Sequence, residues 1–289
     1  MQIGFIGTGI MGTGIIKNLL KVGYDVTVYN RTPAHAQAVL DANAKWADSP
    51  REVAVSSDVT FTMVGFPKDV EQVYFGPDGV LAGAKAGSII VDMTTSQPSL
   101  AARIAAAAAK QDIRSLDAPV SGGDIGAQKG TLTIMVGGDR QAYDELQPLF
   151  AKIGTTNHYF GPAGSGQHAK MANQIMIAGT MTGLTEMLVY AKAAGLDLKT
   201  VLATVGGGGG ANWSLENYGP RILVGDYTPG FFIKHFVKDL RIALEEADWL
   251  GVALPATKQA KALYQAMVDN GHGDLGTQGL ITSYPSWQK

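Results

Sequence analysis

The stretch GSGQHAKMANQ, residues 164–174, places three polar side chains in an otherwise apolar segment that predicts a helix. Positions i, i+3 and i+4 of a helix share one face, so Lys170, Asn173 and Gln174 should form a polar cluster. A lysine amine can transfer a proton, and amide side chains can hold a substrate by hydrogen bonds. Taken alone, the same cluster also fits a solvated helix face, and both interpretations stay open.

A glycine-rich segment near the N-terminus predicts a dinucleotide site. Its spacing G-x-G-x-x-G begins at Gly7, between a strand-like run at 2–6 and a helix that ends at Gly23. The three glycines permit a tight turn, a close approach to a pyrophosphate and close packing of helix on strand. The first turn of that helix offers N–H groups to the phosphates. The candidate contacts are Gly7, Thr8, Gly9, Ile10, Met11 and Gly12, and a merely flexible loop is the alternative.

The end of the second predicted strand indicates which dinucleotide binds. An acidic residue there would bond the ribose 2′-hydroxyl of NAD, but this chain has Asn30, Arg31 and Thr32. No carboxylate would repel a 2′-phosphate, and the arginine can pair with it. These residues favour NADP(H). If Arg31 is only a solvated surface residue, NAD(H) is the cofactor instead.

A second polar cluster, Ser121 with Gly122 and Gly123, follows the fifth predicted strand. Ligands of open α/β sheets bind outside the carboxyl ends of the strands. Consecutive small residues expose backbone N–H groups that can surround an anion such as a substrate carboxylate. An ordinary glycine turn explains the same residues equally well.

Strands and helices alternate up to about residue 162, and helices follow almost exclusively. The predicted strands are 2–6, 25–30, 58–64, 88–94, 113–120, 131–138 and 156–161. The predicted later helices are 163–195, 197–205, 213–224, 235–251 and 255–270, and a shorter one is expected at 33–43. The alternation predicts a doubly wound, mostly parallel sheet. We therefore expect an α/β Rossmann domain at 1–162 and an all-α domain at 163–289, joined by a long helix. The glycine run at 206–210 is expected to end a helix.

Composition excludes several classes of protein. The chain has 289 residues, of which 46% are hydrophobic and 17% charged, and its net charge is −2, so no strong attraction to nucleic acid or anionic membrane is expected. It has no cysteine, and its five histidines lack the spacing of metal ligands, so no metal site is predicted. No signal peptide and no membrane span are recognised in it. We expect a cytoplasmic protein.

The chain resembles the β-hydroxyacid dehydrogenase family, which includes 3-hydroxyisobutyrate dehydrogenase, tartronate semialdehyde reductase and glyoxylate/succinic semialdehyde reductase. Its segments GFIGTGIMG, DAPVSGG, GTLTIMVGG, GSGQHAKMANQ and KDLRIALEEA match the family's motifs in order and span nearly the whole chain. The resemblance implies a Rossmann domain, a helical domain, and a homodimer or homotetramer in which the helical domains associate.

The resemblance also implies roles for individual residues. Lys170 matches the catalytic lysine, and Ser121, Gly122 and Gly123 match the substrate-binding segment. The other matches are Thr95 near the nicotinamide, Lys238 closing over the cofactor, Met63 and Val64 on the adenosine side, and Asn173 supporting the site. Gln174 stands where many members have asparagine and others glutamine, which leaves the substrate's hydrogen-bond partners open.

Together with the residues at 30–32, the resemblance implies an NADPH-dependent oxidoreductase that interconverts a small carboxylated semialdehyde and its hydroxy acid. A cation beside the carbonyl oxygen stabilises the charge that develops there and can donate the proton, which is the part expected of Lys170. An NAD-dependent dehydrogenase of the 3-hydroxyisobutyrate type is the alternative enzyme. A non-catalytic NADP-binding module is the alternative from another class of protein.

Overall fold

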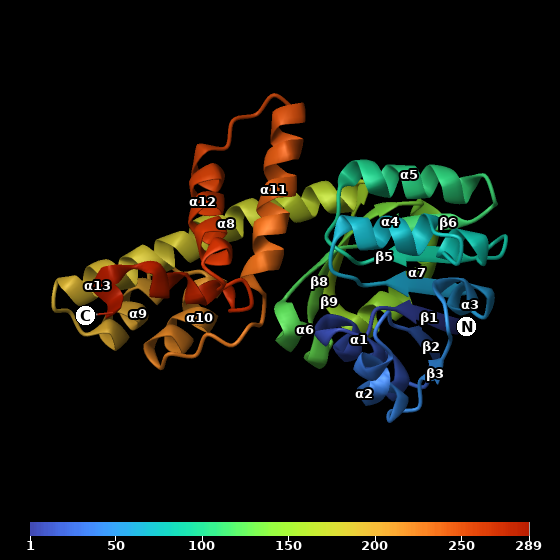
Figure 1. Cartoon of the computed structure of the whole chain (residues 1–289), viewed down its shortest axis with the longest axis horizontal. Coiled ribbons are helices and arrows are strands. Elements are labelled where there is room, and N and C mark those ends of the chain that lie inside the picture. Colours follow the sequence, from blue (N-terminus) through green and yellow to red (C-terminus); the bar gives the residue numbers. More distant parts are fainter. Residues whose placement is uncertain (289) are drawn as a thin grey trace. The chain divides into compact units, whose positions relative to one another are not determined.

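The computed structural model describes residues 1–288 (Figure 1). Packing divides the chain into two compact units, Met1–Lys170 and Met171–Lys289. We describe each unit by itself and name elements as in Figure 1.

A single sheet organises the first unit. Its strands are β1 (Gln2–Ile6), β2 (Asp25–Tyr29), β3 (Lys45–Trp46), β4 (Val59–Thr62), β5 (Ile89–Asp92), β6 (Arg114–Asp117), β7 (Val120–Ser121), β8 (Leu132–Gly138) and β9 (Gly154–Gly161). The order is β3-β2-β1-β4-β5-β6-β8-β7, with β9 paired to β8. The six strands from β3 to β6 are parallel, whereas β8 is antiparallel to β6 and β7. The strand order reverses between β1 and β4, which is where a doubly wound sheet binds its ligand.

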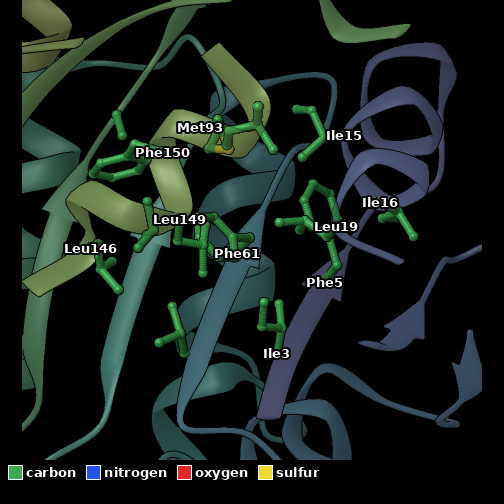
Figure 2. Close-up of a cluster of buried hydrophobic side chains, with 14 of the residues drawn as sticks. Ile3, Phe5, Ile15, Ile16, Leu19, Phe61, Met93, Leu146, Leu149 and Phe150 are labelled. Atoms are coloured by element: carbon green, nitrogen blue, oxygen red, sulfur yellow. The ribbon is translucent and has the colours of Figure 1, made fainter. Parts of the chain in front are cut away.

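Helices cover both faces of this sheet. They are α1 (Ile10–Lys21), α2 (Gln37–Leu40), α3 (Pro50–Val55), α4 (Pro67–Phe75), α5 (Pro98–Ala109), α6 (Gly123–Lys129) and α7 (Arg140–Ile153), with short 3₁₀ turns η1 (Pro33–Ala36) and η2 (Val80–Ala82). Alternate strand residues point to opposite faces. Ile3 and Phe5 therefore pack with α1 and α7 in one buried cluster (Figure 2). Ile6 packs with α3, α4 and α5 in another.

Two local expectations were wrong. The single strand predicted at 113–120 is two strands, because β6 ends at Asp117 and Pro119, which has no N–H to donate, separates it from β7. β6 pairs with β5 on one side and with the end of β8 on the other, and β7 then continues along β8. The helix predicted at 33–43 begins as a 3₁₀ turn and ends at Leu40. The two-residue strand β3 is too short to leave a hydrophobic pattern in the sequence.

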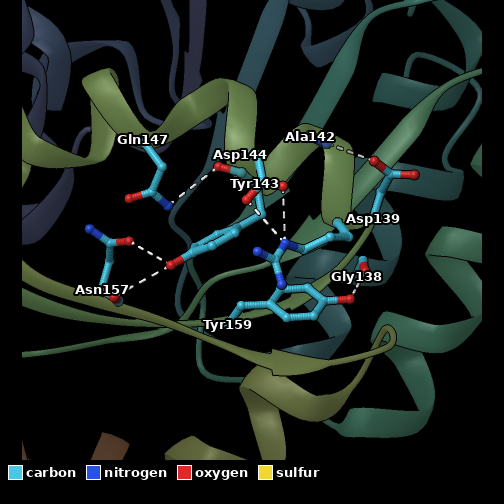
Figure 3. Close-up of polar contacts among 9 residues, drawn as sticks. Gly138, Asp139, Ala142, Tyr143, Asp144, Gln147, Asn157 and Tyr159 are labelled. Atoms are coloured by element: carbon cyan, nitrogen blue, oxygen red, sulfur yellow. Dashed lines mark hydrogen bonds and ion pairs between the residues drawn. The ribbon is translucent and has the colours of Figure 1, made fainter.

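Around β9 and α7, a cluster of aromatic and charged side chains fastens the outer strand (Figure 3). The guanidinium of Arg140 lies 5.8 Å from the ring centre of Tyr143 and 5.2 Å from that of Tyr159. It also bonds both carboxylate oxygens of Asp144 at 3.0 Å, and the Tyr159 hydroxyl donates to the Gly138 carbonyl oxygen at 2.9 Å. These contacts join groups of the protein itself, so we interpret the cluster as structural.

The helix α8 (Ser165–Ala193) begins in the first unit and continues into the second. Its 29 residues form one unbroken helix, as the sequence predicts. The second unit further contains α9 (Leu198–Gly206), α10 (Trp213–Leu223), α11 (Ile233–Trp249), α12 (Pro255–Asp269), η3 (Thr277–Ser283) and α13 (Pro285–Gln288). The glycine run ends α9, as expected.

The helical unit has its own apolar core. The largest side chains in it include Phe236 and Tyr264, whose rings meet edge to face with centres 4.9 Å apart. The Tyr264 hydroxyl donates to the Thr277 carbonyl oxygen at 3.0 Å, so the ring is buried without leaving its polar end unpaired. Its residues form a cluster of their own and share no member with the two clusters that cover the sheet.

Candidate active site

The glycine loop connects β1 to α1 beside the point where the strand order reverses. Gly7 has a φ of +103°, and a Cβ there would lie 2.1 Å from the Met63 carbonyl oxygen. A Cβ on Gly12 would lie 2.0 Å from the Gly7 carbonyl oxygen, whereas one on Gly9 would meet nothing within 4 Å. The first and third glycines therefore allow the loop to fold, and the second keeps the space before it open.

The start of α1 is suited to a phosphate. Its N-cap is Gly9, which has no side chain to bond the first N–H groups, and no acidic residue lies in the first turn. These N–H groups carry the positive end of the helix dipole, and Ile10 beside them is exposed. The loop thus fits a dinucleotide pyrophosphate.

Asn30, directly after β2, holds the glycine loop by a hydrogen bond. Asn30 accepts from the Thr8 N–H at 2.9 Å through Oδ1 and donates to the Thr32 carbonyl oxygen at 2.9 Å through Nδ2. Arg31 is exposed and pairs with the Asp69 carboxylate at 2.9 Å. The guanidinium predicted to meet a 2′-phosphate thus already has an acidic neighbour.

The other candidate residues of the first unit follow the carboxyl ends of its strands. Met63 and Val64 follow β4, and Thr95 follows β5. The loop after β5 is joined to the one after β4 because the Val64 N–H donates to Thr94 Oγ1 at 3.0 Å. Of Thr94, Thr95 and Ser96, only Thr95 has a partly exposed side chain.

The segment after β7 also has an unusual backbone. Gly122 has a φ of +124° and Gly123 a φ of +62°, conformations that favour glycine, and Ser121 before them is half-buried. Asp124 lies in the first turn of α6, so a negative charge accompanies this turn. The two positive φ angles allow the turn to present successive N–H groups to an anion.

Lys170 lies in the second turn of α8, and its side chain is only 6% exposed. The solvated-face interpretation of this lysine is therefore wrong. The start of α8 is fixed to the end of β6, since Asp117 accepts from the N–H groups of Gly164 and Gln167, each at 2.8 Å. The helix that carries Lys170 thus begins at the sheet edge that also holds Thr95.

The Asp117 carboxyl is buried, and its burial raises the pKa to about 6 from 3.8, against the opposing effect of the hydrogen bonds from Gly164 and Gln167. A raised folded-state pKa means that the folded protein holds this proton more tightly than the unfolded chain. The corresponding stability is present below pH 3.8 and is lost as the pH rises to about 6.

We therefore expect Asp117→Asn to change the pH dependence of stability. Between pH 4 and 7 the free energy of unfolding of the wild type should fall relative to the variant by up to about 3 kcal/mol. Urea unfolding of both proteins at a series of pH values measures this difference. Parallel curves over that range would contradict the assignment.

The three candidates of the helical unit, Asn173, Gln174 and Lys238, belong to one network of polar contacts. Gln174 Nε2 donates to Asp239 Oδ2 at 2.6 Å, and Gln174 Oε1 accepts from Asn173 Nδ2 at 2.8 Å. Asp239 also pairs with the Lys238 ammonium at 3.0 Å. Both the oxygen and the nitrogen of the Gln174 amide are thus bonded to protein side chains, which argues against its predicted contact with a substrate.

Sequence reasoning did not single out Asp117, Gln167 or Asp239, although each lies inside a quoted motif. Gln167 precedes Lys170 by three residues and so shares its helix face. Asp239 follows Lys238 directly. The available signals were the acidic residue Asp117 near the end of a predicted strand and the polar residue Gln167 three positions before Lys170.

Neither a metal centre nor a membrane span is found in residues 1–288. No three His, Cys, Asp or Glu side chains in this range gather in a way that could hold a metal ion. No helix in the same range combines the length and apolarity needed to cross a membrane.

Comparisons with known proteins agree with this geometry. Residues 2–164 match the family described as the NAD binding domain of 6-phosphogluconate dehydrogenase. Residues 164–284 match the one described as NAD-binding of NADP-dependent 3-hydroxyisobutyrate dehydrogenase. Together the fold and these matches define an NAD(P)-dependent oxidoreductase.

Individual relatives point to one family within that class. The chain is 50% identical over 281 residues to the 3-hydroxyisobutyrate dehydrogenase-like protein 1 of Arabidopsis thaliana, covering 97% of this chain and 84% of that one. It is 37% identical over 281 residues to 2-hydroxy-3-oxopropionate reductase of Escherichia coli, covering 97% and 96%. The solved structure of Mycobacterium tuberculosis 3-hydroxyisobutyrate dehydrogenase with L-serine is similar with a TM-score of 0.88 and 28% identity, covering 98% and 99%. The chain belongs to the β-hydroxyacid dehydrogenase family and is an NAD(P)-dependent hydroxyacid dehydrogenase.

Proposed function

We propose that this protein is an NADPH-dependent reductase of small semialdehydes that carry a carboxylate, with Lys170 as the general acid and base. The observation that carries the proposal is the burial of Lys170 on α8. The start of this helix is hydrogen-bonded to Asp117 at the end of β6. A buried cation at the ligand-binding edge of such a sheet is suited to stabilise a negative charge that forms on a substrate oxygen.

The proposed reaction reduces an aldehyde to an alcohol. When bound, the nicotinamide supplies the hydride to the aldehyde carbon. The Lys170 ammonium stabilises the negative charge on the carbonyl oxygen and donates a proton from Nζ, which yields the hydroxyl group. In the reverse direction a neutral Lys170 amine takes that proton back.

Backbone groups at Ser121, Gly122 and Gly123 are proposed to hold the substrate carboxylate. Their support is the pair of positive φ angles, which lets successive N–H groups point toward one anion. The hydroxyl of Ser121 is a further donor. A carboxylate held in this way would orient the aldehyde group and account for a preference for acidic substrates.

The glycine loop, Met63, Val64 and Thr95 are proposed to hold the cofactor. For Asn173, Gln174 and Lys238 in the helical unit, the proposed roles rest on the family resemblance. The internal bonds of Gln174 support a modified role, in which it orients Asn173 and Asp239 and does not touch the substrate.

Arg31 is proposed to set the preference for NADPH. We expect Arg31→Ala to raise the KM for NADPH about 10- to 100-fold, because a charge-assisted contact with a phosphate is worth about 1.5–3 kcal/mol. The KM for NADH should hardly change. Steady-state kinetics with both cofactors measure the two values, and equal effects on both would contradict a contact with the 2′-phosphate.

An NAD-dependent dehydrogenase of the 3-hydroxyisobutyrate type is the second candidate. The ion pair between Arg31 and Asp69 favours it, since an engaged guanidinium is less available to a phosphate. A wild type that prefers NADH would select this alternative and leave the assignment of Lys170 unaffected.

A substrate panel tests the proposal. Glyoxylate, succinic semialdehyde, tartronate semialdehyde and methylmalonate semialdehyde are each supplied with NADPH or NADH, and oxidation of the cofactor is followed by its absorbance. Turnover with NADPH on a carboxylated aldehyde is expected. Cofactor binding without turnover on any carbonyl compound would indicate a non-catalytic module instead.

Two further predictions from the sequence belong to this proposal. The family resemblance predicts a homodimer or homotetramer, which light scattering of the purified protein can measure. A cytoplasmic location likewise stays a prediction, which fractionation of the source cells can check.

A further inference from the structure

The Gln167 side chain is fully buried and holds the backbone on both sides of Thr95. Its Nε2 donates to the Thr94 carbonyl oxygen at 2.8 Å, and its Oε1 accepts from the Ser96 N–H at 2.9 Å. A neighbouring strand makes the same pair of bonds to an extended residue. One side-chain amide therefore fixes both peptide groups that flank Thr95.

The same loop is also held from the sheet. The Thr94 N–H donates to Asp92 Oδ1 at 2.9 Å, and the Thr94 hydroxyl oxygen accepts from the Val64 N–H at 3.0 Å. Three atoms of Thr94 are thus hydrogen-bonded. Its N–H and its hydroxyl oxygen bond to residues at or just after the ends of β5 and β4, and its carbonyl oxygen bonds to Gln167 on α8. The partly exposed Thr95 side chain lies in the middle of this fixed segment.

The backbone of Gln167 is as constrained as its side chain. Its N–H donates to Asp117 Oδ2 at 2.8 Å. Beside it, a Cβ on Gly166 would lie 2.4 Å from the Asp117 carbonyl oxygen and 2.5 Å from the Met135 carbonyl oxygen. The first turn of α8 therefore rests directly on the backbone of β6 and β8, with no room for a side chain at residue 166.

We propose that Gln167 is a positioning residue, whose amide sets the place of Thr95 relative to the Lys170 side chain. Gln167 and Lys170 are three residues apart and so lie on one face of α8. The inference rests on the proposed function, in which Lys170 transfers the proton and Thr95 lies at the nicotinamide. A misplacement of about 1 Å between reacting groups can cost about 100-fold in rate.

The first test is Gln167→Leu, which keeps the approximate size of the side chain and removes both hydrogen bonds. Hydrogen–deuterium exchange of a peptide that contains Ser96 should become faster, which reports on the loop in the protein without substrate. In the assay kcat should fall about 100-fold, with KM within about threefold of the wild type, because the substrate still binds but reacts in a worse geometry.

Gln167→Glu separates positioning from packing. The carboxylate can still accept from the Ser96 N–H but cannot donate to the Thr94 carbonyl oxygen. Protonation restores that donor, so the ratio of variant kcat to wild-type kcat should rise as the pH falls. The titratable groups nearby, Asp92, Asp117 and Lys170, are present in both proteins, so their own effects largely cancel in the ratio.

Gln278→Leu is a matched control, because Gln278 is also fully buried and its Nε2 donates to two backbone carbonyl oxygens, those of Asp226 and Thr228. It should lower the melting temperature and leave kcat within about twofold of the wild type. If Gln167→Leu also loses only stability and the Gln167→Glu ratio is flat with pH, Gln167 is not a positioning residue.

Failure of the proposed function has a different signature. In that case the wild type shows no turnover, or Lys170→Ala is as active as the wild type, whatever residue 167 is. If Gln167→Leu does not fold, Gln167→Glu decides the question through its pH profile. An unchanged exchange rate at Ser96 in folded Gln167→Leu would overturn the inference without any activity measurement.

Discussion

Replacing Lys170 by alanine is expected to lower kcat for reduction of a carboxylated aldehyde by about 100- to 10,000-fold, the usual contribution of general acid catalysis. Alanine removes both the proton donor and the charge that stabilises the forming alkoxide. The buried position of Lys170 strengthens this expectation, because its charge is poorly screened by water. The measurement is steady-state oxidation of NADPH by wild type and variant.

Two comparisons make this result specific. Lys110→Ala removes an exposed lysine at the end of α5 and should leave kcat unchanged. A small amine such as methylamine, added to Lys170→Ala, should restore part of the activity by supplying the missing proton donor. Wild-type activity in Lys170→Ala would exclude the lysine from the chemistry.

The second large effect is expected for Gly9→Val. In the protein without cofactor, a Cβ at this position meets nothing within 4 Å, and the backbone has a φ of −68° and a ψ of −172°, which valine adopts readily. The melting temperature of the cofactor-free protein should therefore change by no more than about 2 °C. The Kd for NADPH, measured by fluorescence titration, should rise at least about tenfold, because the new side chain fills the space that the pyrophosphate needs.

Gly7→Ala supplies the contrast. Here the φ of +103° and the Cβ distance of 2.1 Å to the Met63 carbonyl oxygen predict a loss of folding stability with or without cofactor. If Gly9→Val instead destabilised the cofactor-free protein as strongly as Gly7→Ala, its effect on Kd would not report on a cofactor contact.

Local patterns predicted the frame of this protein well. The glycine spacing at 7, 9 and 12, flanked by a strand and a helix, was enough to predict the loop between β1 and α1. The i, i+3 and i+4 spacing from Lys170 was enough to predict a shared face on α8, since helix geometry is fixed within each turn. The parallel order of the first strands followed from their alternation with helices.

Contacts between distant segments could not be predicted in the same way. The bonds from Gln167 to Thr94 and Ser96 span more than 70 residues, and no local pattern encodes them. The pairing of Arg31 with Asp69 likewise depends on how β2 and α4 are placed by the sheet. The hydrogen bond from Gln174 to Asp239 also depends on the packing of α11 against α8 and leaves no local pattern in the sequence.

The bonds of Asn30 have a consequence for how cofactor preference could evolve or be redesigned. Its amide connects the glycine loop to the end of β2, so the position that usually distinguishes the two cofactors is also a structural joint. An aspartate there could still accept from the Thr8 N–H but could not donate to the Thr32 carbonyl oxygen. Substitution of the exposed Arg31 should therefore cost less folding stability than substitution of Asn30. A change of cofactor would begin at Arg31, and Asn30 would follow only after another hydrogen bond held the glycine loop.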